Sequence, residues 1–174
     1  MFNANVWEEG VLYFDPEKHE YWLNGKLLIS TTQLLQKHGL SVDYSDIAPS
    51  ILEAAAEFGK RQHKELENYF KGIQTYENVN DITREGIDLL KQEGIEAVFS
   101  EQRATNGLVA GTIDLVGIQS EQYVMVDYKF TSALYSNPVT WQANIYKNLL
   151  YDNYQIGVSK LYVLWYDKQN AEFK

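Results

Sequence analysis

Three consecutive segments in the second half of the chain alternate apolar and polar side chains, and this pattern constrains the fold more than any other feature. They cover residues 96–103, 108–118 and 123–130. Alternation puts successive side chains on opposite faces of a sheet, so the segments predict three strands joined by two short turns. Helical periodicity precedes and follows this block, and a last strand is predicted over 160–166. The order predicts an α/β (α+β) fold with a mixed central sheet flanked by helices.

The helices are predicted from apolar periodicity and from signals at their ends. A long helix is expected over 50–70, with Ser50 and Glu53 as a capping box, and another over 81–93 that ends at Gly94. A later helix is expected over 139–151, with Pro138 at its first position. The long helix carries an inward stripe whose one strongly polar member is His63. The stripe consists of Leu52, Ala56, Gly59, His63, Leu66 and Phe70.

The first forty residues predict a small β-meander followed by a short helix. Strands are expected over 11–14, 20–23 and 26–29, and Asn24-Gly25 is a strong signal for a type I′ hairpin turn. Ser30 and the two threonines after it cap a helix that closes at Gly39. We expect a single domain over 1–174, with this N-terminal unit in 1–40 and the core in 50–166.

Composition excludes several classes of protein. With 174 residues and 45% hydrophobic content, the chain is long enough for one well-buried core. The absence of cysteine excludes disulfides, iron–sulfur clusters and thiolate zinc sites, so any metal must have oxygen or imidazole ligands. Fifteen Lys and Arg against 24 Asp and Glu give a net charge of −9, which argues against a protein that coats nucleic acid. Any contact with phosphate is therefore expected in one groove.

No targeting segment or membrane span is expected. Residues 1–10 include Glu8 and Glu9 and lack a basic start followed by an apolar run, so they do not resemble a secretion signal. Asp114 interrupts the longest apolar stretch, which is then too short to cross a bilayer. We expect a soluble, cytoplasmic protein.

Charged residues on the second and third strands predict a cation site. Asp127 and Lys129 share one face of the third strand, whereas Asp114 projects from the second strand on the side opposite Ile113 and Leu115. The turn between the strands makes them neighbours, so Asp114 and Asp127 are expected close together. Two carboxylates at one place repel each other, and a divalent cation removes that repulsion.

Four more residues are expected to face this place. His63 comes from the long helix, and Glu101 comes from the first strand with Phe99 on its face. Gln142 and Tyr146 are four residues apart and therefore lie on one surface of the later helix. Taken singly, each has an ordinary explanation, such as a hydrogen-bonded core histidine or a solvated helix residue. Their joint order is what indicates chemistry.

Four motifs of the chain occur in a fixed order. They are Gly59-Lys60-Arg61-Gln62-His63, Gly111-Thr112-Ile113-Asp114, Asp127-Tyr128-Lys129 and Gln142-Ala143-Asn144-Ile145-Tyr146. This series resembles that of the RecB-like branch of the PD-(D/E)XK nuclease superfamily, over about 59–166. The resemblance implies a restriction-endonuclease-like αβββαβ core with a mixed sheet. Because the clustered cysteines of the iron–sulfur members are absent, the chain is most similar to phage-type exonucleases, to whose entry region 27–35 is also similar.

The resemblance implies a role for each matching position. The catalytic residues would be Asp114, Asp127 and Lys129. The metal ligands would be His63, Asp114, Asp127, the main-chain carbonyl of Tyr128 and, as an additional acidic ligand, Glu101. The DNA-binding residues would be Gln142, Tyr146, Lys60, Arg61 and Lys64. The implied cofactor is Mg²⁺, with Mn²⁺ as a substitute, because oxygen-rich ligation with one imidazole suits these ions better than zinc.

The implied activity is hydrolysis of DNA by an exonuclease of recombination or repair, in the cytoplasm of a bacterial or phage-infected cell. Since little chain follows the last strand, self-association or a partner protein of recombination or replication is also expected. Two other classes stay open. One is a catalytically inactive nuclease-fold subunit that binds DNA or regulates, and the other is a protein-interaction module with a Ca²⁺ or ion-pair structural site. The lysines near His63 are equally explained as a solvated helix face.

Overall fold

The computed structural model describes residues 6–7 and 10–174. The elements in chain order are β1 (Val6–Trp7), β2 (Gly10–Asp15), β3 (Glu20–Leu23), β4 (Lys26–Ser30), α1 (Thr31–Lys37), α2 (Pro49–Phe70), the 3-10 turn η1 (Tyr76–Asn78), α3 (Asp81–Gln92), β5 (Glu96–Thr105), β6 (Val109–Gln119), β7 (Gln122–Thr131), α4 (Ser136–Tyr154), β8 (Lys160–Asp167) and β9 (Glu172–Phe173).

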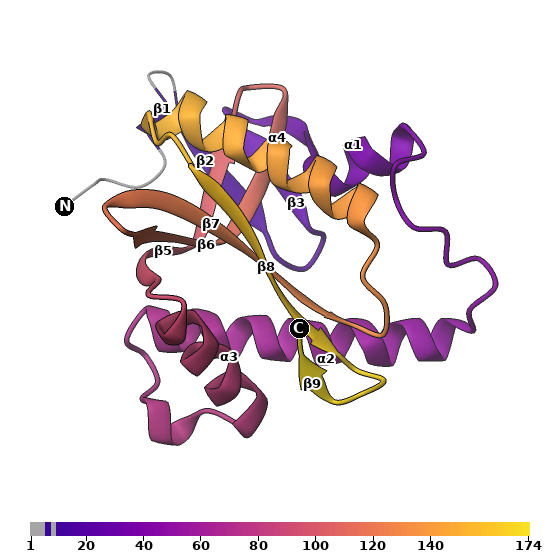
Figure 1. Cartoon of the computed structure of the whole chain (residues 1–174). Coiled ribbons are helices and arrows are strands. Elements are labelled where there is room, and N and C mark those ends of the chain that lie inside the picture. The colour runs from indigo at the N-terminus through magenta and orange to yellow at the C-terminus, as the bar shows by residue number, and fades with distance from the viewer. Residues whose placement is uncertain (1–5, 8–9) are drawn as a thin grey trace.

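The strands of this described part form one mixed sheet between two pairs of helices. Helices α1 and α4 lie on one side of the sheet, and α2 and α3 lie on the other (Figure 1). Strand β6 pairs antiparallel with β5 and β7, while β7 pairs parallel with β8. The predicted α+β fold with a mixed sheet flanked by helices is therefore confirmed.

The N-terminal meander is confirmed as well, and it is continuous with the core sheet. Strands β2, β3 and β4 pair antiparallel in sequence, and Asn24 and Gly25 between β3 and β4 have φ values of 51° and 76°, as a type I′ turn requires. Strand β4 then pairs parallel with β6. This pairing brings the meander beside the residues that follow Gly107, which the sequence did not indicate.

Helix ends agree with expectation where the cap is local and differ where proline is present. Ser30 caps α1 through a capping box with Gln33. The capping box predicted for Ser50 and Glu53 is wrong, because α2 begins at Pro49 and has no side-chain cap. Helix α4 begins at Ser136, so Pro138 is its third residue rather than its first. First-turn N–H groups have no partner within the helix, so proline is tolerated at any of these positions.

Two clusters of buried side chains fill the space on either side of the sheet. The cluster beneath α2 and α3 includes Leu115, Val126 and Tyr128, whereas the cluster beneath α4 includes Ile113 and Met125. The prediction that Ile113 and Leu115 share a face is therefore wrong. Strand alternation is interrupted between them, at Asp114.

Strand β5 explains this interruption. Glu101 has a left-handed backbone with φ 54°, and the pairs on either side of it place it opposite Asp114. Phe99 packs with the α4 cluster, whereas Glu101 lies near His63 of α2. The prediction that Phe99 and Glu101 share a face is wrong for the same reason. The irregularity turns the Glu101 carboxylate toward α2.

Helix α2 differs from the predicted stripe at two positions. Ala56 is exposed, and Gln62, which was not assigned to the stripe, is buried. Among the described residues, no helix combines the length and the apolar character needed to cross a membrane. The expectation about a secretion signal falls mostly on residues 1–5 and 8–9, which lie outside the described part of the chain.

Candidate metal centre

A cleft of about 740 Å³ opens between the sheet and α2, which lines it from Ile51 to Glu67. Its walls come from the β2–β3 hairpin, α2, strands β5 to β7 and the start of α4. Asp114, Asp127 and Lys129 all line it, together with His63 and Glu101. The structure therefore brings the predicted catalytic and ligating side chains to one place.

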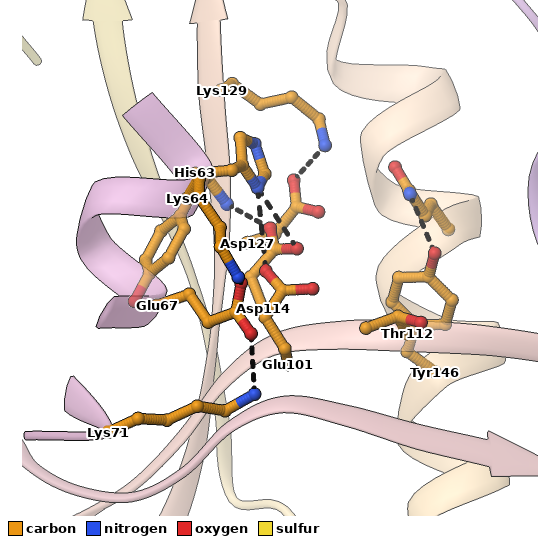
Figure 2. Close-up of polar contacts among 12 residues, drawn as sticks. His63, Lys64, Glu67, Lys71, Glu101, Thr112, Asp114, Asp127, Lys129 and Tyr146 are labelled. Carbon is orange, nitrogen blue, oxygen red and sulfur yellow. Dashed lines mark hydrogen bonds and ion pairs between the residues drawn. The ribbon is translucent and has the colours of Figure 1, made fainter. Parts of the chain in front are cut away.

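Three of these side chains form a compact group. The His63 Nδ1 atom lies 3.6 Å from an Asp114 carboxylate oxygen and 3.9 Å from a Glu101 carboxylate oxygen. One potential ligand atom from each residue lies within 4.8 Å of the other two. Figure 2 shows the imidazole turned toward both carboxylates. This spacing allows one cation to contact all three groups.

Asp114 is held in place by the backbone of the neighbouring strand. The backbone ladder between β6 and β7 runs from the turn to the Leu115–Val126 pair. Beyond it, the Tyr128 N–H donates to Asp114 Oδ2 at 2.7 Å. A hydrogen bond from a backbone amide to a carboxylate is charge-assisted, and it fixes the direction of the side chain. The sequence-based role of the Tyr128 carbonyl as a ligand stays a prediction.

Asp127 and Lys129 project from the face of β7 opposite to Val126 and Tyr128, and they form an ion pair. The Lys129 Nζ atom lies 2.5 Å from Asp127 Oδ2. A dashed line marks this ion pair in Figure 2. Asp127 is only 4% exposed, so its carboxylate needs a positive partner. Because its carboxylate turns to Lys129, Asp127 does not belong to the compact group of His63, Glu101 and Asp114.

Burial and charge shift the protonation equilibria of these groups. Burial raises the pKa of Asp127 to about 6, against the opposing effect of the Lys129 ammonium. Burial also raises the pKa of Asp114, although the charges of His63 and Lys129 and the Tyr128 amide oppose it. For His63 burial acts to lower the pKa, and the carboxylates of Asp114 and Glu101 outweigh it and raise the pKa. The centre therefore has a shortage of positive charge.

The residues present fit a divalent cation. The donor set consists of two carboxylates and one imidazole, with a third carboxylate on Asp127 nearby. Such an oxygen-rich set suits Mg²⁺ or Mn²⁺. A cation would also favour the ionised form of the aspartates whose pKa values burial raises.

Helix α4 closes one side of the cleft. Gln142 donates from Nε2 to the Tyr146 hydroxyl at 3.1 Å, which confirms that the two side chains lie on one surface. Tyr146 is buried, and a Cβ atom on Gly111 would lie 2.4 Å from its ring. Gly111 thus allows β6 to pass close to this tyrosine. The predicted contact of Gln142 and Tyr146 with DNA stays a prediction.

The predicted DNA-binding lysines are only partly directed into the cleft. Lys60 and Lys64 line it, but Lys64 Nζ also pairs with Glu67 at 2.8 Å. The Arg61 guanidinium instead lies 5.6 Å from the centroid of the Phe58 ring and is not part of the lining. Lys168 also lines the cleft, which the sequence did not indicate because it follows the last predicted strand.

Two further features were missed in the sequence. Gln62, next to His63, is buried and accepts a hydrogen bond from Thr83 of α3, whereas the apolar periodicity of α2 assigns it no inward position. Tyr44 and Tyr135 line the cleft from irregular segments, where no periodicity assigns a direction to a side chain.

Comparison with protein-family models and with curated proteins finds no match for this chain.

Proposed function

We propose that this protein is a Mg²⁺-dependent deoxyribonuclease that hydrolyses phosphodiester bonds, most simply as an exonuclease that acts on DNA in the cytoplasm. The observation that supports it is the cleft in which the group of His63, Glu101 and Asp114 lies beside the Asp127–Lys129 pair. The motif series from Gly59 to Tyr146 supports it as well.

Phosphodiester hydrolysis needs an activated water molecule and positive charge near the phosphate. A divalent cation held by the carboxylates and His63 would supply both kinds of assistance. The ammonium of Lys129 lines the cleft and is well placed to contact a phosphate oxygen or to orient the attacking water. Asp127 fixes the position of this ammonium through the ion pair. The Tyr128 amide fixes Asp114 and so limits how far the ligand group rearranges.

The test is incubation of end-labelled linear DNA and of circular DNA with the protein and Mg²⁺. We expect degradation of linear DNA to mononucleotides and resistance of the circles, because an exonuclease requires an end. Nicked or linearised circles would change the assignment to an endonuclease.

Lys129→Ala provides the residue-level test. We expect hydrolysis to fall by about 100-fold or more, since loss of one positioned charge at a transition state has this order of effect. Lys147→Ala is the matched control, because Lys147 is exposed on α4 and does not line the cleft. Lys147→Ala should keep the melting temperature of the wild type within a few degrees. Lys129→Ala leaves the buried Asp127 carboxylate without its partner and should lower the melting temperature, so activities are compared at a temperature at which circular dichroism shows both variants folded. Equal hydrolysis by Lys129→Ala and wild type would contradict the role of Lys129.

A further inference from the structure

A second pocket of about 250 Å³ adjoins the cleft at Lys129. Tyr44, Tyr135 and Gln142 line both spaces, as Lys129 does. Tyr44 lies in the segment between α1 and α2, and Tyr135 immediately precedes α4. Two segments that are far apart in sequence thus meet where the two spaces join.

The two tyrosines are available to a ligand. Tyr44 is 42% exposed and Tyr135 is 49% exposed, which is high for large side chains that line a pocket. Burial raises the pKa of Tyr44, and of its neighbours Tyr135 adds to this rise while the Lys129 ammonium opposes it. An aromatic surface therefore stands within reach of the ammonium of the candidate centre.

The second pocket also differs in charge from the rest of this acidic chain. Among the described residues that line it, Lys129 is the one charged side chain, and the apolar lining includes Leu35, Val42 and Leu134. The chain as a whole has 24 Asp and Glu residues. A ligand with a flat, uncharged ring next to an anionic group would fit this pocket, because the pocket combines apolar and aromatic side chains with a single cation.

We infer that this pocket is a nucleobase subsite, in which Tyr44 and Tyr135 stack against an unpaired base of the strand whose phosphate lies at Lys129. The inference rests on the proposed function, because the phosphate places the base. Duplex DNA stacks its bases inside the helix and presents phosphates outside, so it offers no free base face to such a pocket. An unpaired strand or a frayed end does, and stacking on aromatic side chains tolerates any base.

The test uses binding rather than turnover. A short fluorescein-labelled oligothymidylate is titrated by anisotropy with the Asp127→Asn protein in Mg²⁺, alone and combined with Tyr44→Ala or Tyr135→Ala. Stacking contributions predict that each alanine weakens binding by about 5- to 150-fold. Tyr44→Phe and Tyr135→Phe should keep the affinity, because the ring is retained. Tyr151→Ala is the matched control, since Tyr151 is 55% exposed on α4 and lines neither space.

Two further probes separate stacking from charge. An abasic oligomer of the same length should bind weakly and should not distinguish wild-type tyrosines from alanine, and a blunt duplex should bind less tightly than the single strand. Alanine variants that keep full affinity, or a loss that persists on the abasic strand, would overturn the subsite.

The subsite and the nuclease function fail in different ways. Hydrolysis of DNA by the wild type with no effect of the tyrosines on binding would leave the nuclease and remove the subsite. Base-dependent binding without hydrolysis in Mg²⁺ or Mn²⁺ would leave the subsite and remove the nuclease.

Discussion

Gln62 connects the helix that carries His63 to the neighbouring helix α3, and its replacement should lower stability. Its Oε1 atom accepts hydrogen bonds from Thr83 Oγ1 and Asn80 Nδ2, both at 3.1 Å. Gln62 is 2% exposed and Thr83 is 0% exposed, so water does not replace a lost bond at Thr83. Asn80 is partly exposed and is able to bond to water instead. We expect the cost of Gln62→Leu to come mainly from the Thr83 hydroxyl.

A buried hydroxyl without a partner costs about 1–3 kcal/mol. Leucine has a similar size and a good helix propensity, so little is added for a cavity or for the helix. For a chain of this length, about 2 kcal/mol lowers the melting temperature by roughly 4–8 °C. Differential scanning calorimetry measures this shift. Gln36→Leu is the control, because Gln36 is exposed on α1 and should change stability by less than about 0.5 kcal/mol.

A double-mutant cycle shows whether the hydrogen bond is the cause. Thr83→Val removes the stranded hydroxyl, so Gln62→Leu should cost less in that background, with a coupling energy of about 1–2 kcal/mol. Additive effects of the two substitutions, or a Gln62→Leu protein as stable as the wild type, would refute the reasoning.

Three more predictions concern packing, pH and charge. Gly111→Ala places a Cβ atom 2.4 Å from the Tyr146 ring and 3.0 Å from Thr31 Oγ1, and overpacking of this kind should cost about 1–3 kcal/mol in thermal unfolding; an unchanged melting temperature would contradict the close packing. Hydrogen bonds from Lys174 and Asn170 lower the pKa of Asp167 from 3.8 to about 2. Because the folded pKa is the lower one, the wild type should exceed Asp167→Asn in unfolding free energy at pH 7, and the difference should shrink as pH falls from about 4 to 2; a constant difference in urea titrations would count against the assignment. Glu67→Gln should release Lys64 and Lys71, which pair with it at 2.8 and 2.7 Å, and so tighten DNA binding and steepen its salt dependence, with unfolding free energy changed by less than about 1 kcal/mol; an unchanged salt slope would show that these lysines do not reach phosphate.

Local signals in the sequence were enough for many elements. The turn at Asn24-Gly25 and the cap at Ser30 are set by side chains and backbone within a few residues, and both are found as predicted. The start of α2 is different. The helix begins at Pro49, so Ser50 lies inside its first turn and does not form a capping box with Glu53. The parallel pairing of β4 with β6 joins segments that are far apart, so no local pattern indicates it.

For the site, the sequence indicated which side chains meet. It did not indicate that His63, Glu101 and Asp114 form one group while Asp127 pairs with Lys129. The placement of Asp114 beside β7 followed from the hairpin, and the Tyr128 amide holds it there. The orientation of Glu101 depends on its left-handed backbone, which strict alternation does not anticipate. Tyr44 and Tyr135 come from irregular segments, so their meeting beside Lys129 required the whole fold.

The most direct test of the central claim is a time course of end-labelled single-stranded DNA with wild-type protein and with Asp127→Asn, each in Mg²⁺, in Mn²⁺ and in EDTA. The account predicts labelled products that accumulate with the wild type in either metal, no products in EDTA, and a rate at least about 100-fold lower for the variant. DNA that stays intact with folded wild-type protein in both metals, or hydrolysis that is equal in Asp127→Asn, would contradict it.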